Sequence, residues 1–282
     1  MSKVNVILMG PIGTGKTTAL RTVVEAGHRL AVLATEPGIE NILTHSDKCH
    51  WTYVPPAAED WSVLTQNARL LNDMAVSELL TRKPQSKQEY RQFLAVLTAC
   101  TNFRCDICRQ SFGPVDQFPS DIVFAIDGLT GLSKMSMDLV VGGKPIASQP
   151  EWGAAMGNIE RFIAKCCADT KCSFVLISHV EREVDEVTGG TKLMVSTLGR
   201  RLAPKIPRFF DEVILCRRQG AQFFWSSIDN TADLKVRRLP FSDTIAPDFA
   251  PLLTNDERTL PNEDTLPLHT PGRVPGSVRS QG

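Results

Sequence analysis

The stretch Gly10-Pro11-Ile12-Gly13-Thr14-Gly15-Lys16-Thr17 satisfies the pattern G-x-x-x-x-G-K-[ST] without a mismatch, which is the pattern of a phosphate-binding loop. The apolar run at residues 4–9 before it predicts a buried parallel strand, and residues 17–24 after it predict a helix. Strand, glycine-rich loop and helix are the local context in which this pattern binds a nucleotide. The stretch therefore predicts an α/β fold with a nucleotide site at one edge of its sheet.

The residue types in this loop match the charge of a triphosphate. Gly10, Gly13 and Gly15 let backbone N–H groups curl around the phosphates, and the positive end of the following helix dipole adds to that field. Lys16 is expected to reach the β- and γ-phosphates, and the hydroxyl of Thr17 to ligate Mg²⁺. We therefore expect ATP and Mg²⁺ as cofactors.

Two further carboxylates follow predicted core strands. The strand expected at residues 29–35 runs into Glu36, which could orient or deprotonate the water that attacks a γ-phosphate, or simply lie in a surface turn. The strand expected at residues 121–127 ends in Asp127, the form taken by the Mg²⁺-orienting acid of phosphate-loop nucleotidases. The predicted cofactor-binding set is Gly10, Pro11, Ile12, Gly13, Thr14, Gly15, Lys16, Thr17, Thr18 and Asp127, with Thr17 and Asp127 as the Mg²⁺ ligands.

A histidine ends the next core strand, expected at residues 173–179. At such a position His179 could hydrogen-bond a γ-phosphate and report its presence to the following loop, or merely cap the strand. We predict that the following segment, residues 180–190, is an exposed loop, because it is charged and ends in two glycines. Residues 141–150 are predicted to form a second, mostly uncharged loop.

The other elements follow from periodicity and turn residues. Apolar residues at helical spacing predict a helix from Asp60 to Arg82 and another from Lys87 to Cys100, both with their apolar residues in the core and with a turn at residues 83–86 between them. Further helices are expected at residues 128–140 and 151–169, and paired final strands at residues 212–217 and 221–225. From about residue 253 the apolar periodicity ends, which predicts a disordered tail.

Composition narrows the class of protein. The chain has 282 residues, is 42% hydrophobic and carries a formal net charge of +0, so it can bury a full α/β core but has no global basic field to attract nucleic acid. No apolar segment approaches the roughly 20 residues of a membrane span and no signal-peptide pattern begins the chain, so we expect a cytoplasmic protein with no membrane partner. In that compartment the eight cysteines are expected as free thiols or metal ligands.

The cysteines cluster at one place. Cys105 and Cys108 form a C-x-x-C pair that, with Cys100 nearby and Cys49-His50 upstream, could supply a tetrahedral zinc site. The second C-x-x-C that would make such a site specific is missing, and the spacing favours a loop with reduced thiols.

A short segment at residues 197–208 holds the chain's one concentrated group of positive charge. It could contact the phosphates of DNA or of a neighbouring subunit's nucleotide, or be a solvated face. Its basic residues are Arg200, Arg201, Lys205 and Arg208.

Together these features resemble the RecA-like branch of phosphate-loop ATPases, in the form carried by phage-encoded nucleotide-binding AAA-type proteins that include RecA-related single-strand annealing ATPases. The resemblance extends over roughly residues 3 to 250. The matching motifs are Gly10 to Thr17, Thr35-Glu36, Ile126-Asp127 and Ile177-Ser178-His179, with Gly142-Gly143, Glu151-Trp152-Gly153, Gly189-Gly190 and Glu212 to Leu215 as further points of likeness.

The resemblance implies a RecA-like fold, with a mostly parallel central sheet flanked by helices and antiparallel strands at its C-terminal edge. It implies a core at residues 1–252 with an insertion at about 83–118, followed by the tail at 253–282. It also implies a catalytic set of Glu36, Lys16 and His179, where Glu36 is the catalytic glutamate and His179 stands where many RecA-like proteins have a glutamine.

The implied function is Mg²⁺-dependent ATP hydrolysis on single-stranded DNA in phage recombination, annealing or replication. The implied partners are single-stranded DNA, further copies in a ring or filament, and a single-strand binding protein, with the loops at 141–150 and 180–190 facing the DNA. A nucleotide-kinase-type phosphotransferase and an ATP-gated adaptor with negligible turnover are the alternatives.

Overall fold

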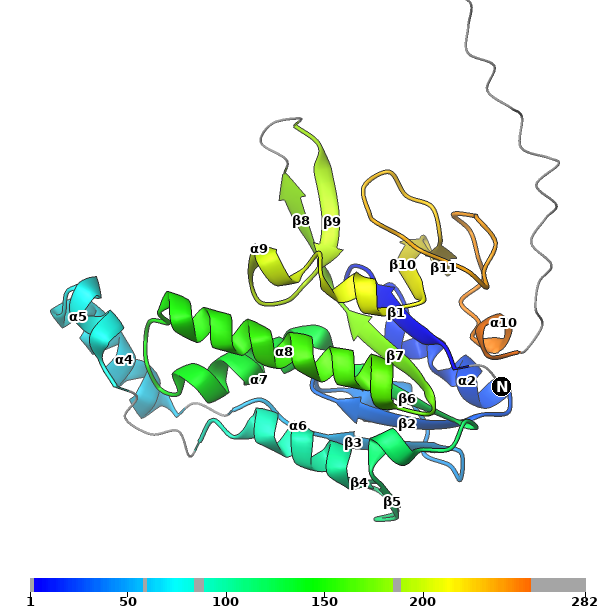
Figure 1. The fold of residues 1–282 in the computed structure, drawn as a ribbon, viewed down its shortest axis with the longest axis horizontal. Coiled ribbons are helices and arrows are strands. Elements are labelled where there is room, and N and C mark those ends of the chain that lie inside the picture. The colour runs from blue at the N-terminus through cyan, green and yellow to red at the C-terminus, as the bar shows by residue number, and fades with distance from the viewer. Residues whose placement is uncertain (1–2, 58–59, 84–88, 185–188, 255–282) are drawn as a thin grey trace, which may run out of the picture.

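A central sheet in the order β11-β10-β1-β7-β6-β2-β3 organises the computed structural model, which describes residues 3–57, 60–83, 89–184 and 189–254 (Figure 1). Every neighbouring pair in this sheet is parallel except β10 and β11, which are antiparallel. This confirms the predicted α/β fold class, including the antiparallel C-terminal edge. The strands are β1 (Asn5–Met9), β2 (Arg29–Ala34), β3 (Cys49–Tyr53), β6 (Ile122–Asp127), β7 (Ser173–Ser178), β10 (Glu212–Gln219) and β11 (Gln222–Ser226).

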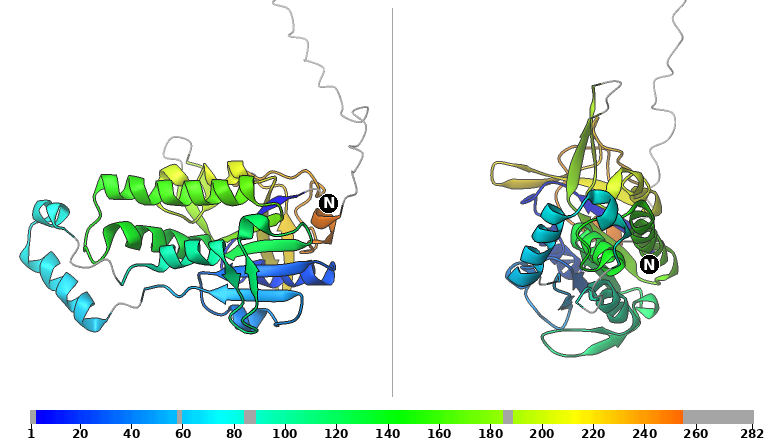
Figure 2. Two further views of the ribbon diagram at one scale, coloured as in Figure 1. Left: turned by 60° about the horizontal axis from the view of Figure 1, so that its bottom comes forward. Right: turned by 90° about the vertical axis from the view of Figure 1, so that its left-hand side faces the viewer.

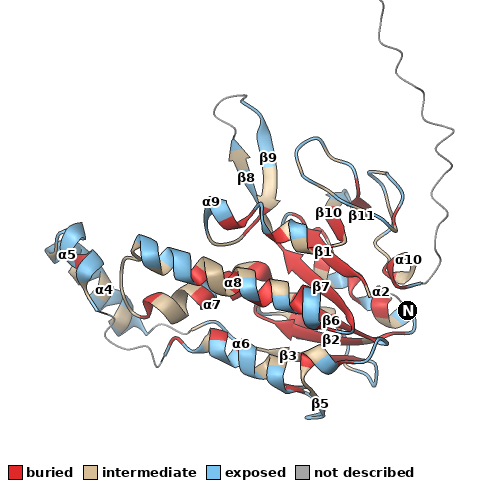
Figure 3. Ribbon diagram, in the orientation of Figure 1, coloured by how far each residue is buried: buried red, intermediate tan, exposed pale blue. Residues whose placement is uncertain are grey.

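Helices cover both faces of the sheet, which explains why its strands are apolar at nearly every position. Alternate residues of β1 enter different cores: Ile7 and Met9 pack on one face, and Val6 and Leu8 on the other. Figure 3 shows the resulting buried sheet between partly exposed helices. On the Ile7 face lie α6 (Gln92–Thr101), α7 (Leu129–Val141) and α8 (Gln149–Asp169), and on the Val6 face α1 (Lys16–Ala19), α2 (Arg21–Glu25), α3 (Ile39–Ile42) and α10 (Ala250–Leu253). Two further views show α7 and α8 running side by side (Figure 2).

Strand register brings the predicted site residues to one edge. Met9 of β1 is paired with Ser178 of β7, and Asp127 of β6 is paired with both Ile177 of β7 and Ala34 of β2. The segments that follow these strands therefore leave the sheet at the same level. Carboxyl ends of parallel strands are the usual ligand-binding edge of an α/β sheet.

The prediction of an exposed loop at residues 180–190 is wrong for its first half. Val180–Val184 forms β8, which pairs with β9 (Thr191–Val195) in an antiparallel hairpin that projects from the sheet (Figure 1). β-branched residues at Val180 and Val184 favour a strand, and Val195 at the base of the hairpin is buried. Charge density alone was a poor guide here, because an exposed two-stranded ribbon keeps its charged side chains in water. Residues 185–188 lie outside the described part of the chain.

The single helix predicted at Asp60 to Arg82 is also wrong in two respects. The structure has two helices, α4 (Trp61–Asp73) and α5 (Val76–Thr81), and α4 buries none of its residues. Trp61 is 82% exposed and Leu71 is 50% exposed. Helical periodicity identifies an apolar face on a helix, but it does not show whether another element packs against that face. These two helices project from the end of the molecule (Figure 1).

The predicted insertion at 83–118 contributes to the main core. Its helix begins later than predicted, as α6, and packs Phe93 and Val96 into the core on the Ile7 face. It continues into a small antiparallel hairpin and a 3₁₀ turn that the sequence did not predict: β4 (Phe103–Arg104), β5 (Ser111–Gly113) and η1 (Val115–Gln117). Of the turn predicted at 83–86, residues 84–86 lie outside the described residues.

Other expectations concern the tail and the cysteines. Leu253, the first residue of the predicted tail, is buried in α10, and residues 255–282 lie outside the described chain. None of the eight cysteines forms a disulfide in the structure. Every helix within the described part of the chain is too short or too polar to span a membrane.

Candidate active site

The phosphate-loop stretch leaves the carboxyl end of β1 and turns into α1. Gly13 and Gly15 adopt φ angles of 74° and 78°, in the left-handed region that favours glycine. Gly10 is required for a different reason: a Cβ there would lie 2.5 Å from the carbonyl oxygen of Cys216 on β10. The three glycines thus let the loop pass close to the sheet and curl around a space in front of it.

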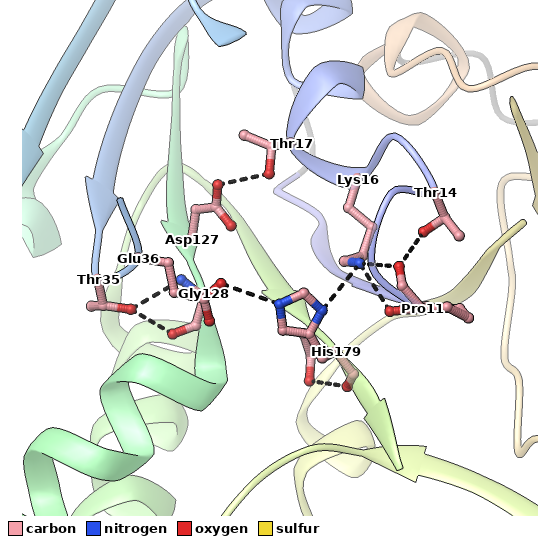
Figure 4. Close-up of polar contacts among 11 residues, drawn as sticks. Pro11, Thr14, Lys16, Thr17, Thr35, Glu36, Asp127, Gly128 and His179 are labelled. Atoms are coloured by element: carbon pink, nitrogen blue, oxygen red, sulfur yellow. Dashed lines mark hydrogen bonds and ion pairs between the residues drawn. The ribbon is translucent and has the colours of Figure 1, made fainter. Parts of the chain in front are cut away.

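Lys16 lies in the centre of this loop. Its side chain is buried, and Nζ donates to the carbonyl oxygens of Gly10 at 2.9 Å and Pro11 at 2.7 Å (Figure 4). Burial lowers the pKa of Lys16, and the nearby acidic groups, among them Asp127 and Glu36, oppose that shift. The ammonium group is therefore held where an anion could replace the carbonyl oxygens as its partner.

Thr17 and Asp127 are joined directly although 110 residues separate them in the sequence. The hydroxyl of Thr17 donates to Asp127 Oδ2 at 2.8 Å (Figure 4). Burial raises the pKa of Asp127 to about 6, with the hydrogen bond from Thr17 opposing the shift. A hydroxyl and a carboxylate are hard oxygen ligands of the kind that Mg²⁺ prefers, so the residues present fit that ion.

Glu36 and His179 also lie close to Lys16. Glu36 Oε2 is 3.2 Å from His179 Nε2, and His179 Nδ1 is 3.5 Å from Lys16 Nζ (Figure 4). A carboxylate accepts and an ammonium donates, so a neutral imidazole with its proton on Nε2 satisfies both contacts. The hydrogen bond from His179 holds the pKa of Glu36 below its usual range, although burial acts in the opposite direction.

Thr35 and two glycines hold Glu36 against the Asp127 strand, a role that the sequence did not predict for them. The Thr35 hydroxyl donates to the Gly128 carbonyl oxygen at 2.6 Å and accepts from the Gly128 N–H at 3.0 Å. A Cβ on Gly128 would lie 2.6 Å from Glu36 Oε1, and one on Gly131 would lie 2.7 Å from the Thr35 carbonyl oxygen. The available signal was a threonine before Glu36 and small residues after Asp127.

These side chains line one cleft of about 180 Å³. Residues 13–18 of the loop contribute, and so do Glu36, Asp127 and His179. Ile12 is 85% exposed, so its side chain does not enclose the cleft. Within the described chain, Lys16 is the only Lys or Arg among the lining residues. The site combines one buried cation with an oxygen pair for a metal and a carboxylate held by a histidine.

The four basic residues predicted as DNA or neighbour contacts lie outside the cleft. All are exposed, on α9 (Gly199–Leu202), η2 (Ile206–Phe209) or the turn between them. Arg200 lies 3.3 Å from Glu183, and Lys205 lies 3.1 Å from Glu160. Arg201 has no ion-pair partner among the residues that the structure describes.

The three cysteines named as possible zinc ligands are also remote from the cleft, and Cys100 lies apart from the other two. Cys105 and Cys108 lie in the turn between β4 and β5, whereas Cys100 on α6 lines a different hollow together with Cys166.

Comparison with known proteins gives a family and two distant structural likenesses. A family model described as an AAA domain matches residues 2–239, which include the phosphate loop, Glu36, Asp127 and His179. No curated protein matches the chain. A crystal structure of the RadB recombinase is 14% identical over 85% of this chain and 84% of its own, with a TM-score of 0.38. A prototypical ATPase from the type III secretion system of pathogenic bacteria is 13% identical over 76% of this chain and 52% of its own, with a TM-score of 0.34. At these scores neither likeness bears on function.

Proposed function

The chain belongs to the AAA-domain family, and on that premise we propose that it is a Mg²⁺-dependent ATPase with a RecA-like core that acts on single-stranded DNA. The observation that carries the proposal is the hydrogen bond from Thr17 to Asp127. It joins the phosphate loop to the carboxylate that a phosphate-loop nucleotidase uses for its metal. Glu36, the candidate base, lies in the same cleft.

Each side chain has a role that follows from its contacts. Lys16 binds the β- and γ-phosphates, whose oxygens would replace the carbonyl oxygens of Gly10 and Pro11 as the hydrogen-bond acceptors of its ammonium group. Thr17 and Asp127 would hold Mg²⁺, which when bound neutralises charge on the phosphate oxygens. Glu36 accepts a proton from the attacking water, and a carboxylate whose pKa is lowered is fully ionised for that task near neutral pH. His179 orients Glu36.

The composition of the cleft supports assembly of several copies. Phosphoryl transfer commonly uses an arginine or lysine beyond that of the loop to stabilise the transition state, and a neighbouring chain can supply it. Lys16 is alone in this respect among the lining residues described. We therefore include in the proposal a homo-oligomer, a ring or filament, in which Arg208 or Lys205 completes the neighbour's site.

The hairpin after His179 supports a link between the nucleotide and DNA. β8 begins at Val180, directly after His179, and the Ser196 N–H at the end of β9 donates to the His179 carbonyl oxygen at 2.8 Å. The exposed arginines of α9 follow a few residues later. A shift of His179 on phosphate binding would thus reach the hairpin and the basic segment, which offers cations to the DNA phosphates.

The test is ATP hydrolysis measured with and without single-stranded DNA, together with retention of that DNA on a filter. The variant Arg200→Ala/Arg201→Ala, which removes the two exposed arginines of α9, is expected to lose most of the stimulation by DNA. The control Lys171→Ala removes an exposed cation just before β7, away from the cleft edge, and should behave as the unmodified chain.

Three results would redirect the proposal. Equal hydrolysis with and without DNA, with none retained, removes DNA from the function. Turnover that requires a nucleoside monophosphate supports a phosphotransferase instead. Tight ATP binding with negligible turnover under every condition supports an ATP-gated adaptor.

A further inference from the structure

Four side chains able to bind a metal meet at the edge of the sheet opposite the ATP cleft. His45 lies in the loop after α3 and His50 at the start of β3, while Cys105 and Cys108 lie in the turn between β4 and β5. One ligand atom from each residue lies within 4.8 Å of the others. Two segments distant in sequence therefore present two imidazoles and two thiols to one point.

The spacing approaches that of a tetrahedral site. Zinc binds nitrogen at about 2.0 Å and sulfur at about 2.3 Å, which places two tetrahedral ligands about 3.3–3.8 Å apart. His50 Nδ1 lies 3.6 Å from Cys108 Sγ, within that range. The other pairs require only a small contraction, since none exceeds 4.8 Å.

The two histidines are prepared to act as ligands. His50 Nε2 lies 3.2 Å from the Asp47 carbonyl oxygen, which can only accept, so the proton belongs on Nε2 and the Nδ1 lone pair faces Cys108. Ligand histidines in zinc sites usually donate their other N–H in this way. His45 Nε2 is shielded from solvent with no hydrogen-bond partner among the described residues, an unsatisfied state that proteins normally avoid.

The backbone around Cys105 and Cys108 forms a hydrogen-bonded turn that holds the two cysteines in place. The Cys105 N–H donates to the Gln110 carbonyl oxygen at 2.9 Å, and the Arg109 N–H donates to the Cys105 carbonyl oxygen at 3.0 Å. Arg109 has a φ of 61°, which is uncommon for a residue other than glycine and marks a tightly constrained turn. Asp106 fixes the turn to the edge of the sheet, because its N–H donates to the Trp51 carbonyl oxygen at 2.9 Å.

We propose that His45, His50, Cys105 and Cys108 bind one Zn²⁺ ion that fastens the β4–β5 turn to the loop before β3. Two thiolates and two imidazoles suit zinc, and a closed set of four protein ligands is the mark of a structural rather than a catalytic site. The inference replaces the expectation of reduced thiols. It differs from the sequence-based ligand set in that Cys100 and Cys49 have no part and His45 is added.

The first experiment measures zinc in the purified full-length chain by mass spectrometry, after dialysis to remove loosely bound metal. The unmodified chain should carry about one zinc per molecule, and Cys108→Ser should lose at least about nine-tenths of it, because one of four ligands is gone. Cys108 is exposed, so this substitution disturbs little packing. The matched control Cys100→Ser should keep its zinc. Binding of a fluorescent ATP analogue at the remote cleft shows whether each variant is folded.

A second measurement uses Co²⁺ as a spectroscopic substitute for zinc. The unmodified chain should give the intense visible bands of tetrahedral cobalt and a near-ultraviolet band from thiolate to cobalt, and His45→Ala and Cys108→Ser should lose or weaken both. The proposal is overturned if the folded unmodified chain holds no zinc and gives no tetrahedral cobalt spectrum. It is equally overturned if Cys108→Ser retains as much zinc as Cys100→Ser.

Discussion

Glu36 gains most of its acidity from one neighbour, His179. The hydrogen bond from His179 favours its charged form more strongly than burial opposes it, so the pKa lies below the usual range. The same imidazole also faces Lys16, so one side chain separates the candidate base from the candidate phosphate-binding cation. Two functional predictions follow at this scale, one for the carboxylate and one for the histidine.

Replacing Glu36 by Gln should lower the rate of ATP hydrolysis by about 10²–10⁴-fold, the usual contribution of a general base. ATP affinity should change little, because phosphate binding rests on the loop and Lys16. A coupled hydrolysis assay and equilibrium binding of an ATP analogue measure the two effects. The control is Glu40→Gln, an exposed glutamate on α3 that should keep full activity. Unchanged hydrolysis in Glu36→Gln would remove this residue from the mechanism.

Replacing His179 by Ala should move the acid limb of the pH–rate profile toward higher pH. The hydrogen bond from His179 lowers the pKa of Glu36, so its loss lets burial raise that pKa, and the carboxylate becomes protonated at a higher pH. The profile of kcat at saturating ATP reports this limb. A uniform loss of rate with an unmoved limb would mean that His179 serves the phosphate and not Glu36.

At the scale of elements, α8 depends on its first turn. Both the N–H and the hydroxyl of Ser148 donate to Glu151 Oε2, at 2.7 and 2.8 Å, and Lys144 Nζ lies 2.9 Å from Glu151 Oε1. Burial raises the pKa of Glu151, but these hydrogen bonds outweigh it and the net pKa is lowered. The helix runs beside α7 over the core, so its start helps fix one covering layer of the sheet.

Replacing Ser148 by Ala should reduce the free energy of unfolding by about 1 kcal/mol, the usual value of a helix cap. Because the folded pKa of Glu151 is lowered, its stabilisation is complete above its ordinary pKa of about 4.3 and is lost as pH falls through the folded value. The difference between the two proteins in urea unfolding should therefore shrink in acid. Glu160→Ala, on the same helix, removes a partly exposed ion pair and should cost at most about 1 kcal/mol with no such dependence on Glu151.

At the scale of the whole molecule, the two candidate sites lie at opposite ends of the parallel strands. The ATP cleft lies at the carboxyl ends of the parallel strands, and the candidate zinc ligands lie at the amino end of β3. The hairpin β8–β9 and the basic segment continue from the cleft edge. Lys16 is the only Lys or Arg among the described residues that line the cleft, so under the proposed function a complete site requires a second copy of the chain.

Mixing two inactive variants tests that requirement. Lys16→Ala disables a chain's own cleft, and Arg208→Ala disables what it lends to a neighbour, so each alone should hydrolyse little ATP. An equal mixture should recover about a quarter of the unmodified rate, because random pairing places an intact Lys16 cleft beside an intact Arg208 at about one interface in four. A mixture of Lys16→Ala with Glu36→Gln should recover almost nothing, because both residues act in one cleft.

If Arg208→Ala alone is fully active, the same mixing is repeated with Lys205→Ala. Full activity of both single variants would exclude this segment from the neighbour's site.

The sequence by itself determined the local features: the phosphate loop, the apolar strands on either side of it, and the polar residues where those strands end. Such features depend on the conformations of consecutive residues, which composition and periodicity report directly. Prediction from the sequence failed where the result depended on whether another part of the chain packs against a segment, as for the exposed apolar face of α4 and the charged ribbon at β8.

Tertiary structure alone decided which distant residues meet. Sheet order and register place Asp127 beside Thr17, and His179 between Glu36 and Lys16. They also bring the turn at Cys105 to the loop of His45, a pairing that no spacing in the sequence marks. The reason is that a contact between separated segments depends on how the strands are ordered and packed, and no single segment carries that information.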